Sequence, residues 1–128
     1  MFIGSIKENI NLEKRVAITP ETAKSIISLG LNISLEKDYA SHLGISDKQY
    51  EEKGVNFYNT SSEVINNSKL LLKVNCPTDE EIKSLKEKTI LVGIFNPTMN
   101  KNKLREILKK NINIFSLELL PRISRAQS

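Results

Sequence analysis

Short apolar runs alternate with amphipathic stretches along the whole chain, a pattern typical of alternating strands and helices. The apolar runs predict strands at residues 2–6, 31–35, 55–58, 69–74, 89–95 and 112–117. Helical spacing predicts helices from Pro20 to about Gly30 and over residues 47–53, 61–67, 79–87 and 101–110. Each of the first four has a start signal, namely Thr19 before Pro20 and the capping-box pairs Ser46/Gln49, Thr60/Glu63 and Thr78/Glu81.

Strands this apolar are typical of a parallel sheet that is buried on both faces. We therefore predict one α/β domain over residues 1–128. Its doubly wound, mainly parallel sheet of about six strands would be flavodoxin-like or Rossmann-like, with helices on both faces. In the last helix, Leu104, Ile107 and Leu108 are expected to face inward.

Composition narrows the function classes. Hydrophobic residues make up 39% and charged residues 27%, as in ordinary globular proteins, and no apolar run approaches the ~18 residues of a membrane span. This argues against direct membrane insertion. The net charge of +4 suggests nucleic acid, but the lysines alternate with glutamates and aromatic residues make up only 5%, which argues against such a partner. The single cysteine, Cys76, leaves no internal disulfide and favours a reducing cytoplasm.

Candidate chemistry follows the predicted strands, because ligands of such sheets bind beyond the carboxyl ends of the strands. Arg15 lies in the loop after the first strand, Lys73 at the end of the fourth, and Arg122 to Gln127 after the last. We expect these residues to line one crevice. Two alternatives stay open: Arg15 as an ordinary surface residue, and Lys73 as a snorkelling or edge-strand lysine.

Other reactive residues favour simpler interpretations. His42, the only histidine, lies in a polar region and is expected at the surface, while Cys76 has no partner at metal-ligand spacing and favours an apolar filling role. We therefore expect no metal. No Gly-x-Gly-x-x-Gly fingerprint occurs. We expect the chain to be the first part of a longer polypeptide in which the Gly-rich dinucleotide fingerprint lies downstream, and the isolated fragment to be inactive.

Three strings carry a family resemblance: 14–20 (KRVAITP), 71–75 (LLKVN) and 122–127 (RISRAQ). Together they resemble the start of the NAD(H)-binding alpha subunit of proton-translocating NAD(P) transhydrogenases, whose N-terminal domain is shared with alanine dehydrogenases. The resemblance implies hydride transfer between NADH and NADP coupled to proton translocation. It also implies NAD(H) bound mainly by a downstream domain, NADP(H) on a partner domain, membrane and NADP-binding partner subunits, and a homodimer. The protein would be cytoplasmic and peripheral to the membrane.

The resemblance also implies roles for individual residues. Arg122 and Gln127 would belong to a loop that contacts NAD(H), with Gln127 aligning the nicotinamide carboxamide for hydride transfer. In alanine dehydrogenases, an Arg and a Lys matching Arg15 and Lys73 hold the keto acid, and a histidine follows the strand that matches residues 89–95. The segment after Phe95 here reads Asn-Pro-Thr, without histidine, which counts against that activity. The alternatives are an alanine dehydrogenase-type oxidoreductase and a non-catalytic module that binds a small ligand or a partner.

Overall fold

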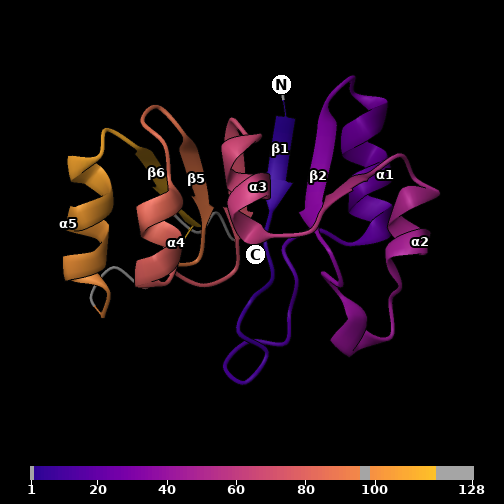
Figure 1. Cartoon of the computed structure of the whole chain (residues 1–128), viewed down its shortest axis with the longest axis horizontal. Helices are drawn as coiled ribbons and strands as arrows, with labels where there is room; N and C mark the ends of the chain where they lie inside the picture. Colours follow the sequence, from indigo (N-terminus) through magenta and orange to yellow (C-terminus); the bar gives the residue numbers. More distant parts are fainter. Residues whose placement is uncertain (1, 96–98, 118–128) are drawn as a thin grey trace, which may run out of the picture.

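The computed structural model describes residues 2–95 and 99–117, which form a parallel sheet flanked by helices (Figure 1). The strands are β1 (Phe2–Ser5), β2 (Asn32–Glu36), β3 (Asn56–Tyr58), β4 (Leu70–Lys73), β5 (Ile90–Gly93) and β6 (Asn113–Ser116). The helices are α1 (Pro20–Ser28), the 3-10 turn η1 (Ser41–Leu43), α2 (Asp47–Glu51), α3 (Ser61–Asn66), α4 (Asp79–Ser84) and α5 (Lys101–Lys109). No helix among the described residues is long and apolar enough to span a membrane.

The strand order is β3-β2-β1-β4-β5-β6, and every neighbouring pair is parallel. This confirms the predicted doubly wound sheet. Of the two predicted alternatives, the strand order is that of the Rossmann fold and not that of flavodoxin. The chain builds outward from β1 in one direction and then returns to β4 to build the other half. The switch point, where a ligand crevice is expected, therefore lies between β1 and β4.

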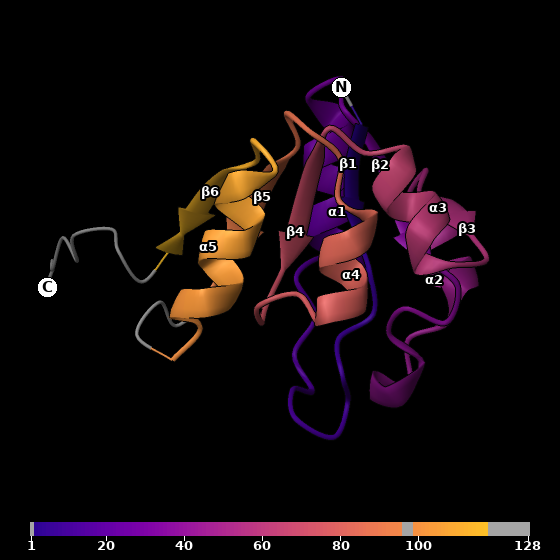
Figure 2. The ribbon, with the colours of Figure 1, turned by 60° about the vertical axis from the view of Figure 1, so that its left-hand side comes forward.

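Helices cover the two faces of the sheet in separate groups. Helices α3, α4 and α5 lie in front of the sheet in Figure 1, and Figure 2 shows α4 and α5 beside β4, β5 and β6. Beneath them is a core that includes Leu71, Leu91, Phe95 and Ile107, each at most 1% exposed. A second core, around Ile33, Leu35 and the rings of Tyr39 and Tyr50, lies on the other face.

The second face of β4, β5 and β6 is only half buried, so the expectation that the strands are buried on both faces is wrong there. Register places Leu72, Val92 and Phe115 in one row across these strands. Leu72 and Val92 are partly buried, and Phe115 is 57% exposed. The second core reaches Leu72 of this row, which packs against it, but it includes neither Val92 nor Phe115.

The helices differ from the sequence predictions at several ends and in one orientation. Helix α1 ends at Ser28 and α2 at Glu51, two residues before their predicted ends. Helix α4 ends at Ser84 rather than at residue 87, because Leu85 is already extended. In α5, Ile107 is buried and Leu104 partly buried, but Leu108 is 58% exposed, so its predicted inward orientation is wrong. With Leu104 and Ile107 directed to the core, Leu108 lies at the margin of the apolar stripe.

Candidate functional site

A pocket of about 270 Å³ opens at the carboxyl edge of the sheet, beside the switch point. It is formed by the loop after β1, the ends of β4 and β5, and the residue after β6. The residues that line it are Arg15, Val16, Ala17, Leu72, Lys73, Val74, Val92, Gly93, Ile94 and Leu117. Apart from Arg15 and Lys73 these side chains are apolar or absent, so the pocket suits a small and largely apolar group.

Gly93 sets how closely the strand ends approach in this pocket. It pairs with Lys73 across β4 and β5. A Cβ at position 93 would lie 2.1 Å from the Lys73 carbonyl oxygen and 2.5 Å from the Phe95 ring. A larger residue therefore cannot stand there without displacing backbone, and the absence of a side chain fits the close strand packing.

Arg15 lies at the exposed rim of the pocket and is already paired. Its Nε and Nη2 donate to the two carboxylate oxygens of Glu13 at 2.8 and 2.9 Å, and its backbone N–H donates to the same carboxylate at 2.9 Å. These hydrogen bonds hold the pKa of Glu13 at about 2. The same contact raises the pKa of Arg15. The Nε and Nη2 groups of the Arg15 guanidinium are thus both paired with the carboxylate of Glu13, two residues earlier in the chain.

Lys73 lies deeper, with a side chain only 3% exposed. Its Nζ is 3.3 Å from Glu8 Oε1 and 3.3 Å from Glu81 Oε1. Glu8 comes from the loop after β1, and Glu81 from the first turn of α4. A buried ammonium needs such partners, because its transfer from water is costly when the charge is unpaired.

Glu8 fixes the loop after β1 to the end of β4. Its carboxylate accepts the backbone N–H groups of Val74 at 2.8 Å and Asn75 at 3.2 Å, as well as facing Lys73. Its side chain is 1% exposed. One buried carboxylate therefore satisfies both the lysine and the backbone just after it.

Tyr39 holds the next part of the same loop. Its hydroxyl lies 2.7 Å from Ser5 Oγ, which donates to the Leu72 carbonyl oxygen at 2.6 Å. The Tyr39 oxygen also accepts the N–H groups of Ala17 and Ile18. Burial raises the pKa of Tyr39, so the phenol stays neutral and the network keeps its donors. The backbone wall of the pocket is thereby fixed against β1 and β4.

Tyr50 fixes the same wall from the side of α2. Its hydroxyl donates to the Ile18 carbonyl oxygen at 2.7 Å, and burial raises the pKa of Tyr50 to about 12. Its ring meets that of Tyr39 edge to face, with centroids 5.8 Å apart. Both tyrosines thus act on the wall through buried, neutral phenols.

The structure brings Arg15 and Lys73 to one pocket, at the edge where the sequence placed them. The other predicted site residues, Arg122 and Gln127, lie outside the described residues, and so does the Asn-Pro-Thr segment 96–98. His42 lies in the 3-10 turn, and its Nε2 donates to the Lys14 carbonyl oxygen at 2.7 Å. This hydrogen bond holds the loop next to Arg15. Cys76 packs against the first core, and burial raises the pKa of its thiol.

Sequence reasoning missed Glu8, and it read Glu81 only as a helix cap. Glu81 does close a capping box, because its Oε1 accepts the Thr78 N–H at 3.0 Å while Thr78 Oγ1 accepts the Glu81 N–H. The sequence did contain one signal for such a partner: Lys73 ends an apolar strand, and a buried lysine needs an acid close to its ammonium. Which of the 15 acids supplied it depended on tertiary structure.

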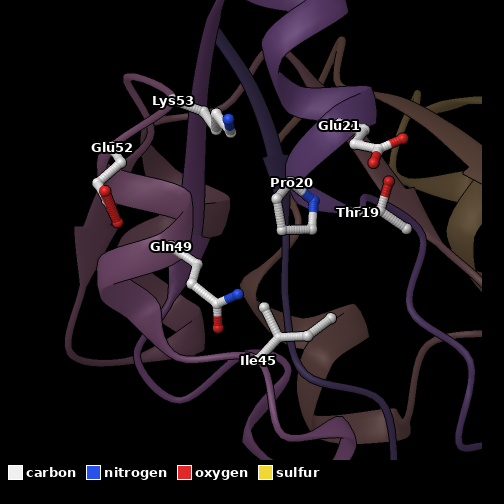
Figure 3. Close-up of a pocket in the computed structure, with 7 residues that line it drawn as sticks. All are labelled: Thr19, Pro20, Glu21, Ile45, Gln49, Glu52 and Lys53. Atoms are coloured by element: carbon white, nitrogen blue, oxygen red, sulfur yellow. The ribbon is translucent and has the colours of Figure 1, made fainter.

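A larger pocket, of about 570 Å³, lies elsewhere, between α1 and α2. Figure 3 shows its lining, with Thr19, Pro20 and Glu21 from the start of α1 on one side, and Gln49, Glu52 and Lys53 from α2 and the turn after it on the other, above Ile45. It contains none of the predicted site residues and is open and mixed in charge. The smaller pocket, with its two cations at the switch point, is the better functional candidate. Among residues 2–95 and 99–117, no cluster of three or more His, Cys, Asp or Glu residues could hold a metal.

Comparison with known proteins identifies a family match and several relatives of this chain. Residues 4–128 match the family described as "Alanine dehydrogenase/PNT, N-terminal domain". The NAD(P) transhydrogenase subunit alpha of Haemophilus influenzae is 37% identical over all of this chain and 25% of its own length. An NAD(P) transhydrogenase alpha subunit of Rickettsia prowazekii is 34% identical over all of this chain and 34% of its own length. Alanine dehydrogenases also match, at lower identity than either.

A solved structure agrees with these relatives. The crystal structure of transhydrogenase from Sinorhizobium meliloti matches with a TM-score of 0.90 and 28% identity, over 99% of this chain and 38% of that one. The chain thus spans between a quarter and about two fifths of the length of these relatives. On the family match over residues 4–128, the chain belongs to the alanine dehydrogenase/PNT N-terminal domain family.

Proposed function

We propose that this chain is the N-terminal part of the NAD(H)-binding alpha subunit of a proton-translocating NAD(P) transhydrogenase. In that role it works within a larger chain or complex that transfers hydride between NADH and NADP. The observation that carries the proposal is the match over the whole chain to the transhydrogenase alpha subunits of Haemophilus influenzae and Rickettsia prowazekii, at 37% and 34% identity against 29% and 32% for two alanine dehydrogenases. The TM-score of 0.90 with a transhydrogenase supports it.

The pocket fits one part of a nicotinamide nucleotide. At about 270 Å³ it lies just below the usual range of ~300–1,000 Å³ for ligand pockets, so it suits a small ring better than a whole dinucleotide. The described residues contain no Gly-x-Gly-x-x-Gly turn to hold a pyrophosphate. We therefore assign most NAD(H) contacts to a downstream domain and one apolar wall of the nicotinamide site to this chain.

The chemistry of the pocket suits hydride transfer. NAD(H) supplies the hydride, so the protein's part is to position the ring and exclude water. Val16, Leu72 and Val92 offer apolar walls for that purpose. The ionisable side chains among the described lining residues are Arg15 and Lys73, and both are paired with carboxylates. Neither is set up as a general base.

Arg122 and Gln127 complete the proposed site. We assign them to the loop that contacts NAD(H), with Gln127 donating to and accepting from the nicotinamide carboxamide. Attachment to the cytoplasmic face of the membrane through partner subunits, and a homodimer of the full subunit, belong to the same proposal. NADP(H) is held by a partner domain, and no metal takes part.

The test is steady-state hydride transfer in a transhydrogenase complex assembled with this chain. Gln127→Ala should lower the rate about 10- to 100-fold while leaving the folded state intact, because misplaced reactants lose this much. Gln49→Ala, on α2, is the matched control and should transfer hydride at the parent rate. An unchanged rate in Gln127→Ala would remove the role assigned to that residue.

A binding measurement tests the division of labour. By calorimetry, the 128-residue chain alone should bind NADH weakly or not at all, whereas the assembled subunit should bind it. Tight binding by the isolated chain would contradict the assignment of NAD(H) mainly to a downstream domain.

The second candidate is an alanine dehydrogenase-type oxidoreductase. One observation favours it, since Arg15 and Lys73 line the same pocket and could grip a 2-oxo acid. Assay of the assembled protein with alanine and NAD separates the two candidates. Alanine-dependent reduction of NAD, without transfer to NADP, would select the dehydrogenase.

A further inference from the structure

One buried tyrosine lies behind two walls of the switch-point pocket that are far apart in sequence. Ala17, in the loop after β1, lines one wall, and Leu72, in β4, lines another. Tyr39 is 1% exposed and is not among the lining residues. Its hydroxyl nevertheless connects the two walls, to Ala17 directly and to Leu72 through Ser5.

The hydrogen bonds around Tyr39 run in one direction only. Ser5 has a single hydroxyl proton, which it donates to the Leu72 carbonyl oxygen at 2.6 Å. Across the 2.7 Å contact between the two hydroxyls, Tyr39 must therefore be the donor and Ser5 the acceptor. The Tyr39 oxygen in turn accepts the N–H groups of Ala17 at 3.1 Å and Ile18 at 3.3 Å. The single donor and both acceptor sites of the phenol are thus used.

This chain of hydrogen bonds joins elements at the switch point. Ser5 pairs with Leu72 across β1 and β4, and Tyr39 comes from the segment after β2. Glu8 holds the beginning of the loop after β1, whereas Tyr39 holds its end, at Ala17, where the loop lines the pocket. The separation of the two walls is therefore set by two buried hydroxyls.

We propose that Tyr39 is a positioning residue for hydride transfer, because its hydroxyl fixes the wall at Ala17 relative to the wall at Leu72 and so orients the ring held between them. The inference rests on the proposed function for the identity of that ring as nicotinamide. Tyr39 acts through the backbone of both walls and not by touching the ring. A displacement of only about 1 Å can lower the rate of such a reaction on the order of 100-fold.

Tyr39→Phe keeps the buried ring and removes only the hydroxyl. In the assembled complex it should lower kcat for hydride transfer about tenfold, because the two walls are no longer held at one separation. KM for NADH should stay within about twofold of the parent value, because most NAD(H) contacts are assigned to the downstream domain. Tyr58→Phe, the same change in the edge strand β3, is the matched control and should leave both constants unchanged.

A variant destabilised elsewhere separates positioning from a merely structural role. Ile65→Ala opens a cavity in the first core, and Ile65 does not line the pocket. By urea denaturation it should lose at least as much stability as Tyr39→Phe, yet it should keep the parent kcat at a temperature where both are folded. Ser5→Ala breaks the same chain at its next link and should lower kcat in the same way, so it serves if Tyr39→Phe fails to fold.

Amide hydrogen exchange of the 128-residue chain tests the connection without NAD(H). In Tyr39→Phe, the amides of Ala17 and Ile18 should exchange at least about tenfold faster than in the parent, because both lose their acceptor. The amide of Ala23, which donates to the Thr19 carbonyl oxygen, is the internal control and should exchange at the parent rate.

Three results would overturn the proposal. They are a folded Tyr39→Phe complex with the parent kcat, an Ile65→Ala complex that loses as much kcat as Tyr39→Phe, and unchanged exchange of the Ala17 and Ile18 amides in Tyr39→Phe. A parent complex that transfers no hydride would instead refute the proposed function. The exchange measurement would then still decide whether Tyr39 holds the wall of the pocket.

Discussion

At the scale of single residues, Glu8 joins three groups that are far from it in sequence. It contacts the Lys73 ammonium and accepts the N–H groups of Val74 and Asn75, and of these contacts only the one with Asn75 is part-buried rather than buried. A buried acid of this kind stabilises the fold because its removal leaves the other groups without partners. Its role is therefore first structural, and it acts on the pocket by holding Lys73 in place.

Glu8→Ala should lower the free energy of unfolding by about 3–5 kcal/mol, because a buried ammonium loses a partner and two backbone N–H groups lose their acceptor. Urea denaturation followed by circular dichroism measures this loss. Glu106→Ala, at an exposed position of α5, is the control and should stay within about 0.5 kcal/mol of the parent. Equal stability of the two variants would refute a structural role for Glu8.

The Glu13–Arg15 pair predicts a pH dependence. The pKa of Glu13 lies at about 2 in the folded chain against an ordinary 4.5. Because the folded pKa is the lower one, the pair stabilises the fold fully above pH 4.5, and this contribution is lost as the pH falls toward 2. Carboxyl carbon NMR should find the Glu13 midpoint near pH 2, and Arg15→Gln should move it upward. A midpoint already near 4.5 in the parent chain would show that the pair does not form.

At the scale of elements, burial differs sharply between strands of similar apolar character. Leu71 in β4 is 1% exposed, whereas Phe115 in β6 is 57% exposed. Periodicity identified both strands, but it could not reveal that α1 and α2 cover only one half of their face of the sheet. That depends on the lengths and directions of the crossovers.

Leu71→Ala should therefore cost about 2–5 kcal/mol of stability, as expected for a cavity in a packed core. Phe115→Ala should cost less than about 1 kcal/mol, because the ring already contacts solvent over half its surface. Thermal unfolding of both variants provides the comparison. A larger loss for Phe115→Ala than for Leu71→Ala would mean that β6 is covered and β4 is not.

Elements were predictable where local signals fix them, and less so where they end. The cap at Thr19 and the box at Thr78 mark helix starts correctly, because they act within one turn. The end of α4 was missed by three residues, since Leu85 turns away to place its side chain in the core. The candidate site was likewise predictable in part. The ends of the predicted strands indicated Arg15 and Lys73, whereas the acids that pair with them could not be predicted because tertiary structure brings them together.

At the scale of the whole molecule, the described sheet is centred on β1 and β4, which each have at least two strands on either side. The edge strands are β3 and β6, each with one neighbour. The pocket opens beside the central pair, so its backbone belongs to the best-supported part of the fold. This is a rigid platform for positioning a ligand.

Amide hydrogen exchange should reflect this order. The amides of β1 and β4 should exchange slowest, close to the rate set by global unfolding, and those of β3 and β6 faster, because edge strands open locally. NMR in deuterated water measures both classes in one experiment. If residues 56–58 in β3 were as protected as residues 70–73 in β4, the central position of β4 would confer no extra stability.

A single carboxylate oxygen connects the pocket to helix α4. Glu81 Oε1 accepts the Thr78 amide that precedes the helix, and it also faces the Lys73 ammonium. Because the two groups share one acceptor, any shift of the ammonium changes how fully the oxygen is left to the amide that precedes α4. The position of the lysine and the start of the helix are therefore linked through one atom.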